Sequence, residues 1–355
     1  MFISYISNGM NLLIITQKVD KNDENLGPFY YWFEEFKKHC SSVTVIAAVR
    51  GSSSPPDGVE VFTFGKDEGR GRIGRIWKFW EFFSHHYARS DAVLFHQIPE
   101  FVLAASPFTL SLRRPTGLWY AHKSVTTRLK FAEKMVDCVF TSSAEGFRLP
   151  SKKVLYVGQA IRTDFFTPMT NSIGSNRQGL RLITVGRIAP VKNYEAIINA
   201  CAVLKEKWPR PWSLSIVGGP MLTRDKEYLT ALKKMVAEKG LASYVSFYGP
   251  RPYAELPEIL REHDMFLNTS GTGSLDKAIL DAMSCGLSII TSNEAYRKIL
   301  PPPYFLEEPN PALLAERIKA LADENRPNLA LREIVVKNHN LSQTIAKIIS
   351  AISSR

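Results

Sequence analysis

The chain alternates short apolar segments with longer amphipathic ones, and an interruption divides this alternation into two series. In residues 1–166 the β-branched apolar segments are Leu12–Ile15, Val43–Val49, Val59–Phe64, Ala92–Phe95, Gly117–Tyr120 and Val139–Thr141. Helical patterns lie between them over residues 28–40, 72–88, 100–112 and 124–135. Continuous apolar strands separated by helices predict a parallel sheet that is covered on both faces.

Residues 167–179 interrupt this pattern. They read TPMTNSIGSNRQG, and their Pro, Ser, Asn and Gly content is typical of a linker. The alternation then resumes over residues 180–325, with strands expected at Leu182–Val185, Leu214–Val217, Val245–Tyr248, Met265–Asn268 and Ser288–Thr291, and helices at 192–207, 225–239, 254–262, 276–285 and 310–323. The sequence therefore predicts two doubly wound α/β domains in tandem. Ligands of such domains bind at the carboxyl ends of the strands and in clefts between domains.

Cysteine usage and charge narrow the class of protein. Four scattered cysteines without a CxxC pair argue against a disulfide framework and a cysteine-based zinc site, and they suit a reducing cytosol. The net charge of +11 leaves nucleic acid, a membrane surface and phosphorylated small molecules open as partners. No apolar run approaches the ~20 residues that span a bilayer, and residues 1–16 lack the features of a signal peptide. We therefore expect a cytoplasmic protein, or one peripheral at the inner face of the membrane.

A basic turn joins one expected strand to the following helix. It reads VGRIAPVKN over residues 185–193 and contains Arg187 and Lys192. A helix N-terminus offers free N–H groups and a partial positive charge, and both favour phosphate. Because Arg adds a planar set of donors and Lys a point charge, the pair is suited to a diphosphate. A solvated basic loop is the alternative, and these residues alone leave both interpretations open.

Three further segments follow strands of the same domain. Gly218 and Gly219 end one strand, and glycine there allows the backbone to approach a ligand, although the motif is also typical of a plain turn. The segment VSFYGPR over 245–251 has the same two interpretations. Residues 270–277, SGTGSLDK, form a glycine-rich loop that leads into an apolar helix, a geometry that suits an oxyanion. Within that helix Asp281 is either a hydrogen-bonded core residue or a ligand for hydroxyl groups.

Taken together and in this order, the motifs resemble the retaining glycosyltransferases of family 4, which have the GT-B fold. The resemblance rests on VGRIAPVKN (185–193), SIVGGP (215–220), VSFYGP (245–250) and GSLDKAILDAMSCG (273–286). It implies two Rossmann-like domains that face each other across a cleft. Residues 1–166 would bind the acceptor and residues 180–325 the nucleotide-sugar, while residues 326–355 would form a C-terminal helix that crosses back towards the first domain.

The resemblance also implies roles for individual residues of the second domain. Arg187 and Lys192 would bind the diphosphate of the donor. Gly218 and Gly219 would line the donor site, and Pro250 with Arg251 would face the nucleobase.

Two carboxylates of the family pattern are altered in this chain. The family carries two glutamates, of which the first touches the donor sugar and the second holds the ribose hydroxyls. Their positions here are Gly273 and Asp281, so one carboxylate is absent and the other is one methylene shorter. The backbone of Ser274, Leu275 and Asp276 would then contact the sugar, and Asp276 would supply the missing carboxylate. Unchanged turnover of an Asp276→Ala variant would rule out that last role.

The implied reaction transfers a sugar from a nucleoside-diphosphate sugar to an acceptor hydroxyl of a glycan, polysaccharide or lipid-linked molecule, with retention at the anomeric carbon. Such a transfer needs charge stabilisation on the departing diphosphate and close positioning of the acceptor. In the first domain, Gly27 and His122 lie where the family contacts acceptor and sugar, and a half-buried loop histidine is the alternative for His122. No metal or other cofactor is expected, because GT-B enzymes do not generally need one and the chain shows no Asp-x-Asp motif.

The segment RGRIGRIWKFWEFFSHHYAR over residues 70–89 is both basic and aromatic. Helical spacing predicts a core stripe of Ile73, Ile76, Trp77, Trp80, Ser84 and Tyr87, and an opposite side of Arg75, Lys78, Phe79, Phe82, His86 and Arg89. Aromatic residues interleaved with positive charge outside the core stripe favour contact with anionic lipid. An ordinary core helix with a solvated basic rim is the alternative.

Four other functions compete with this interpretation. A nicotinamide oxidoreductase should show GxGxxG after the first strand, and residues 16–27 do not. A nucleotide-sugar epimerase of GT-B fold should carry several cleft carboxylates and histidines. A degenerate GT-B protein that binds a nucleotide or partner without transfer is compatible with Gly273 and Asp281. A nucleic-acid partner is not expected, since only residues 70–89 approach a concentrated basic and aromatic face.

Overall fold

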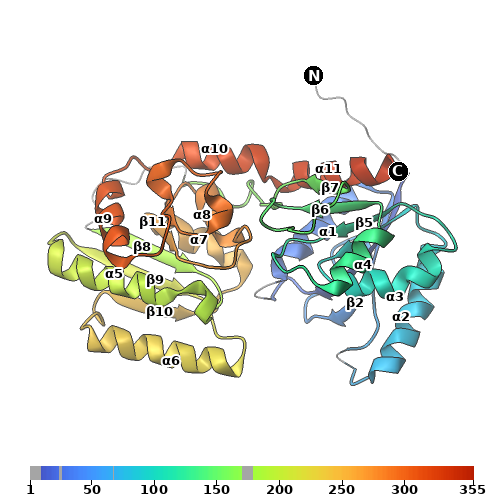
Figure 1. Ribbon diagram of the computed structural model, residues 1–355, viewed down its shortest axis with the longest axis horizontal. Coiled ribbons are helices and arrows are strands. Elements are labelled where there is room, and N and C mark those ends of the chain that lie inside the picture. The colour runs from blue at the N-terminus through green and yellow to red at the C-terminus, as the bar shows by residue number, and fades with distance from the viewer. Residues whose placement is uncertain (1–8, 24–25, 67, 170–178) are drawn as a thin grey trace. The chain divides into compact units, whose positions relative to one another are not determined.

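Two parallel sheets form the framework of the computed structural model, which describes all residues except 1–8, 24–25, 67 and 170–178 (Figure 1). The chain divides into unit 1, residues 1–160 with 341–355, and unit 2, residues 161–340. Each unit contains one of the sheets. The fold class predicted from the alternating pattern is therefore confirmed, as two doubly wound parallel-sheet units.

Unit 1 contains the larger sheet, in the order β3-β2-β1-β4-β5-β6-β7, with every neighbouring pair parallel. Its strands are β1 (Asn11–Val19), β2 (Ser42–Arg50), β3 (Val59–Thr63), β4 (Ala92–His96), β5 (Thr116–Trp119), β6 (Cys138–Thr141) and β7 (Val154–Tyr156). Its helices are α1 (Gly27–His39), α2 (Arg72–Tyr87), α3 (Pro99–Thr109), α4 (Thr127–Met135) and α11 (Leu341–Ser353). The central strands are buried on both faces, as their continuous apolar sequences require.

Unit 2 repeats the same topology with the strand order β10-β9-β8-β11-β12. Its strands are β8 (Leu180–Val185), β9 (Trp212–Val217), β10 (Val245–Gly249), β11 (Met265–Asn268) and β12 (Ser288–Thr291). Its α-helices are α5 (Tyr194–Lys207), α6 (Thr223–Glu238), α7 (Leu256–Arg261), α8 (Lys277–Ser284), α9 (Pro311–Leu321) and α10 (Leu329–Asn338). The strand order reverses direction between β8 and β11, which is where ligands bind in open α/β sheets.

The boundaries of the units differ from those predicted. Ile161 belongs to unit 2 because its N–H donates to the carbonyl of His339 at 2.6 Å, so residues 161–166 leave the first domain. The C-terminal stretch forms two helices rather than one, with α10 in unit 2 and α11 in unit 1. Helix α11 buries Ile345, Ile348 and Ile352 in unit 1, which anchors the end of the chain there. The expected linker lies mostly outside the described residues.

Helix α2 exposes four of the six residues that periodicity placed in its core stripe, whereas Tyr87 is buried as predicted and Trp80 is half-buried. Ile73 and Trp77 are 74% and 65% exposed, and Ile76 and Ser84 are exposed as well. Phe79, expected on the opposite side, is buried, and Phe82 is half-buried. The reason is that α2 contacts the unit only from its middle onward, where Phe79, Phe83 and Tyr87 pack into the core and the Trp80 indole donates to the carbonyl of Ala104 at 2.8 Å.

Candidate functional site

The basic turn after β8 has the conformation of a helix entrance. Pro190–Lys192 form one turn of 3₁₀ helix, and Asn193 then adopts a left-handed conformation with φ of 51° before α5 begins. Asn tolerates this region better than most residues. The turn thus presents Arg187 and Lys192 at the carboxyl edge of the unit 2 sheet, as the sequence predicts.

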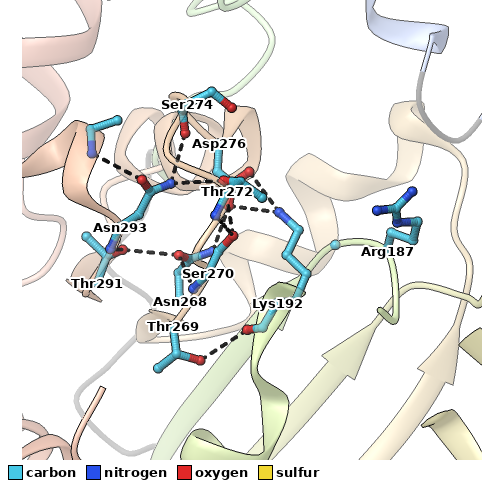
Figure 2. A network of polar contacts seen from close by, with 12 residues as sticks. Arg187, Lys192, Asn268, Thr269, Ser270, Thr272, Ser274, Asp276, Thr291 and Asn293 are labelled. Atoms are coloured by element: carbon cyan, nitrogen blue, oxygen red, sulfur yellow. Dashed lines mark hydrogen bonds and ion pairs between the residues drawn. The ribbon is translucent and has the colours of Figure 1, made fainter. Parts of the chain in front are cut away.

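Lys192 forms an ion pair with Asp276, and the two residues come from loops 84 positions apart in the sequence (Figure 2). Its ammonium nitrogen lies 2.7 and 2.8 Å from the two carboxylate oxygens. The two side chains are only 16% and 14% exposed. The amide of Asn268 also donates to Asp276, at 3.1 Å. The positive charge of Lys192 is therefore balanced within the protein.

Arg187 stands apart from this pair. Figure 2 shows its guanidinium group to one side of Lys192, with no contact drawn to the other labelled residues. It is half-buried, and within the described part of the chain it has no ion pair. Arg187 thus offers a planar set of donors at the same edge of the sheet.

Buried polar side chains hold the glycine-rich loop of residues 270–276 from beneath. Asn293 is fully buried, and its amide donates to the carbonyl of Ser274 at 2.9 Å. The side-chain oxygen of Asn268 accepts hydrogen bonds from the Ser270 N–H and the Thr291 hydroxyl, both at 3.1 Å. These contacts fix the loop at the ends of β11 and β12 (Figure 2). The sequence analysis missed Asn268, the last residue of β11, and Asn293, two residues after β12, although an Asn at the end of an apolar strand could have pointed to them.

The same loop is tied to the basic turn. The N–H of Gly271 donates to the carbonyl of Val191 at 2.9 Å, and the Thr269 hydroxyl donates to that of Asn193 at 2.7 Å. The two segments with the predicted phosphate and sugar contacts therefore form one continuous surface. A shift of either segment would move the other.

Gly273 occupies a backbone conformation that glycine adopts freely. Its φ of 64° lies in the left-handed region, where a glutamate would be strained. The loss of the first family carboxylate thus accompanies a loop conformation that suits glycine. Leu275 is buried, whereas Ser274 and Asp276 are half-buried.

Asp281 lies in α8 and outside the network of Figure 2. It is 2% exposed, and the Tyr253 hydroxyl donates to it at 3.4 Å. Burial raises the pKa of Asp281 to about 6, although the charge of Lys277 and the Tyr253 hydrogen bond act in the opposite direction. Burial also lowers the pKa of Lys277. The site therefore contains a carboxyl group that is costly to ionise.

The ends of β8, β9 and β10 leave no space for side chains. A Cβ atom at Gly218, whose φ is 139°, would lie 2.0 Å from the carbonyl oxygen of Gly186. A Cβ atom at Gly219 would lie 3.3 Å from the ring of Pro250. Arg251 is exposed and 3.8 Å from Glu255. The structure therefore brings the predicted residues Gly218, Gly219 and Pro250 together and leaves Arg251 at the surface.

In unit 1, two predicted residues lie at the carboxyl edge of the sheet. Gly27 begins α1 and is buried against the loop before it, because a Cβ atom there would lie 2.9 Å from the carbonyl oxygen of Lys21. His122 is exposed rather than half-buried, and its Nδ1 accepts from the Ser124 N–H at 3.1 Å. In the neutral ring this hydrogen bond places the proton on Nε2, which is then a donor.

A buried histidine in the same unit escaped the sequence analysis. His96 ends β4, and its Nδ1 lies 3.0 Å from the Thr16 hydroxyl. Burial lowers its pKa to about 3, so the ring is neutral at physiological pH. The next residue, Gln97, has a φ of 64°, an uncommon conformation for a residue other than glycine. A single sequence offers no signal for either property.

The described residues contain neither a cluster of metal ligands nor a helix that could span a membrane. No three His, Cys, Asp or Glu side chains among them gather closely enough to hold a metal ion. No described helix has the length and apolar character needed to cross a bilayer.

Part of the chain is similar to proteins of known family. Residues 167–340 match the family model of glycosyl transferases group 1. A D-inositol 3-phosphate glycosyltransferase from Thermobispora bispora is 27% identical over 176 residues, which are 46% of this chain and 40% of that protein. A mannosylfructose-phosphate synthase from Agrobacterium fabrum is 29% identical over 116 residues, or 32% of this chain and 26% of that protein. The chain thus spans less than half the length of these relatives.

Solved structures match over almost the whole chain. Anabaena HepE in complex with UDP-glucose has a TM-score of 0.77 and 16% identity, and the match covers 98% of this chain and 100% of that one. Sucrose-phosphate synthase from Thermosynechococcus elongatus has a TM-score of 0.76 and 13% identity, over 97% and 98% of the two chains. At these identities the likeness concerns the fold.

Proposed function

From the match of residues 167–340 to the family model of glycosyl transferases group 1, and from the GT-B fold of the two units, we propose that this chain is a retaining glycosyltransferase. It would move a sugar from a nucleoside-diphosphate sugar to an acceptor hydroxyl. The observation that carries the proposal is the joined surface of the basic turn and the glycine-rich loop at the carboxyl edge of unit 2.

The leaving diphosphate would be stabilised by the two cations of the turn. Negative charge develops on the diphosphate as the glycosidic bond breaks, and fixed positive groups favour that state. Arg187 has no ion pair among the described residues and would bind first. Lys192 would exchange Asp276 for the diphosphate, and the released carboxylate would accept a hydrogen bond from a donor-sugar hydroxyl. We propose that these groups act without a metal ion, with attack on the same face as the leaving group.

The remaining donor contacts follow from the geometry of unit 2. The bare backbone at Gly218 and Gly219 would let the nucleotide approach the strand ends closely. Pro250 and Arg251 would face the base, and Asp281 the ribose hydroxyls. We take UDP and GDP as the candidate nucleotides and test UDP first. The reason is that HepE, whose fold matches 98% of this chain, was solved in complex with UDP-glucose.

The acceptor and the location follow from unit 1. His122 would donate from Nε2 to a hydroxyl of the donor sugar. The basic first turns of α2 expose Ile73, Ile76 and Trp77, which suits contact with an anionic membrane surface at the cytoplasmic face and a role in polysaccharide synthesis. All four cysteines are buried free thiols, as a reducing compartment favours. Cosedimentation with anionic vesicles at low salt tests the membrane contact, and absence of binding would refute it.

A thermal-shift panel of UDP, GDP, ADP and their sugar conjugates tests the donor site. Ligands that bind the folded state raise its stability by RT ln(1 + [L]/Kd). We expect a shift with one nucleotide family that is lost in Arg187→Ala and in Lys192→Ala. The matched control is Arg210→Ala, an exposed cation of unit 2 that pairs with Asp323. A shift that survives both site variants, or no shift with any nucleotide, would refute the proposal.

A binding protein without transferase activity is the second candidate. It is favoured by the loss of a carboxylate at Gly273 and by the pairing of Lys192 with Asp276. Nucleotide binding without consumption of any nucleotide-sugar, across a set of acceptors, would support it. Analysis of the sugar nucleotides after incubation distinguishes the transferase and the binding protein from an epimerase. An epimerase would convert the nucleotide-sugar into its epimer and would need no acceptor.

A further inference from the structure

Unit 1 contains a cavity of about 570 Å³ at the carboxyl edge of its sheet. Gln17 on β1 and Ala48 on β2 line its floor, and helices α2 and α3 line its sides. The position of the cavity at this edge of a parallel sheet is where such folds bind ligands.

The inner wall of the cavity is aromatic. The rings of Phe64 and Phe79 meet edge to face at 5.6 Å, and those of Phe64 and Phe101 at 6.0 Å. Ile76, Ile98 and Ala104 extend this apolar wall. Such a lining favours a hydrocarbon group and gives little for a sugar to hydrogen-bond.

The rim of the cavity is positively charged. Lys66, Arg72 and Arg75 line it, and none of them has an ion pair among the described residues. The one acid that the described residues contribute to the lining, Glu100, is 2.5 Å from Arg128 and is thereby neutralised. Helix α2 also begins here without a side-chain cap and without an acid in its first turn, so the positive end of its dipole adds to the field. The rim therefore favours an anion, and phosphate in particular.

Apolar side chains continue from the cavity onto the open surface of α2, which lies at the periphery of unit 1 (Figure 1). Ile73 and Trp77 stand on the same two helical turns as Arg72 and Arg75, and both are exposed. A free anion would not need the aromatic wall, and a plain hydrocarbon would not need three cations. The combination matches a molecule in which phosphate is attached to a long hydrocarbon chain.

We propose that this cavity holds the phosphate and the adjoining hydrocarbon of a lipid-phosphate-linked acceptor. The proposal rests on the proposed glycosyl transfer and specifies its acceptor as a sugar carried on a lipid phosphate or diphosphate. The phosphate lies between Arg72, Arg75 and Lys66, the first part of the chain lies against Phe64, Phe79 and Phe101, and the rest of the lipid follows Ile73 and Trp77.

Binding of three soluble probes to the full chain tests this proposal. They are n-decyl phosphate, n-decyl maltoside, which has the same chain without charge, and inorganic phosphate, with the two alkyl probes kept below their micelle concentrations. Calorimetry should show that decyl phosphate binds at least about tenfold more tightly than either of the other two, because charge-assisted hydrogen bonds add to apolar burial.

Two variants separate the contributions of rim and wall. Arg72→Gln with Arg75→Gln should reduce decyl phosphate affinity to that of decyl maltoside and leave decyl maltoside unchanged. Ala104→Phe, which narrows the cavity, should weaken both alkyl probes, with circular dichroism as the check on folding. Lys152→Gln, an exposed cation at the opposite edge of the sheet, is the matched control and should change neither. Equal binding of charged and uncharged probes, or binding that ignores the rim double variant, would overturn the proposal.

The donor panel keeps this test distinct from the test of the proposed function. Nucleotide shifts in the rim double variant should equal those of the wild type, because the nucleotide contacts are in unit 2. Decyl phosphate binding without any nucleotide binding would refute the proposed function and support an anionic lipid site. Nucleotide binding without selective decyl phosphate binding would refute the acceptor class alone. Binding of decyl phosphate only together with formation of a dimer would also overturn the assignment, because the patch would then be a contact between two copies of this chain.

Discussion

Replacing Asp276 with asparagine should strengthen nucleoside-diphosphate binding while it weakens the fold. The carboxylate holds the Lys192 ammonium at 2.7 and 2.8 Å. At an effective dielectric constant near 20, charges at this separation attract by about 6 kcal/mol. Desolvation offsets most of that attraction, and both side chains are largely but not completely buried. Between the values for exposed and buried pairs, we expect Asp276→Asn to lower the free energy of unfolding by about 2 kcal/mol.

The same change removes a competitor of the ligand. In the wild-type protein the diphosphate must displace Asp276 from Lys192, and in the variant it need not. If about 2 kcal/mol of pairing is no longer lost on binding, the Kd for the nucleoside diphosphate should fall about ten- to thirtyfold. Sugar transfer should nevertheless fall, because the carboxylate that accepts from the donor sugar is gone.

A double-mutant cycle and a calorimetric titration provide the assay. In urea unfolding, the loss of unfolding free energy in the Lys192→Met/Asp276→Asn double variant should be well below the sum of the losses in the two single variants. Calorimetric titration with the nucleoside diphosphate gives the affinity. Asp323→Asn is the matched control, because its ion pair with Arg210 is exposed, and it should change neither the free energy of unfolding measurably nor the affinity for the nucleoside diphosphate. If Asp276→Asn weakens diphosphate binding as Lys192→Met does, the competition described here is wrong.

Three further changes have defined outcomes. The pKa of the Asp281 carboxyl is near 4 in the unfolded chain and about 6 in the folded protein, so its contribution to stability is present below pH 4 and is lost as pH rises through 6. The unfolding free energy of Asp281→Asn relative to wild type should therefore rise by up to about 3 kcal/mol between pH 4 and 7, measured by urea titration. A difference that does not change with pH would contradict the burial of the charged group. Gly218→Ala places a Cβ atom 2.0 Å from the Gly186 carbonyl oxygen and should lower the melting temperature and abolish the thermal shifts caused by nucleotides. Gly71→Ala, with open space around it, should do neither. A wild-type melting temperature in Gly218→Ala would show that the strand ends can separate. Asn293→Ala removes the support of Ser274 and should reduce transfer more than nucleotide binding, measured by initial rates and calorimetry, and equal losses in both would assign Asn293 to the general stability of unit 2.

The strands and their parallel arrangement followed from the sequence because buried parallel strands are continuous apolar segments. All eleven expected strands occur, and only the short β7 was missed, since its three residues are partly exposed. The faces of α2 were predicted wrongly because periodicity reports an apolar stripe and not which part of the helix reaches the core. Ile73 and Trp77 fit the stripe but lie beyond the point of contact.

The residues of the proposed donor site were predicted from their place after strands, yet their contacts were not predictable. The pairing of Lys192 with Asp276 joins two loops that only the sheet order brings together. The support given by Asn268 and Asn293 depends on hydrogen-bond geometry, which a single sequence does not encode. The pKa of Asp281 depends on how deeply α8 is buried, and no local pattern measures that.

A crystal structure with the nucleoside diphosphate selected by the thermal-shift panel tests the central claim most directly. The account predicts diphosphate oxygens within about 3 Å of the Arg187 guanidinium and the Lys192 ammonium, with Lys192 displaced from Asp276. A diphosphate bound elsewhere, or bound at this edge while Lys192 still holds Asp276, would contradict it.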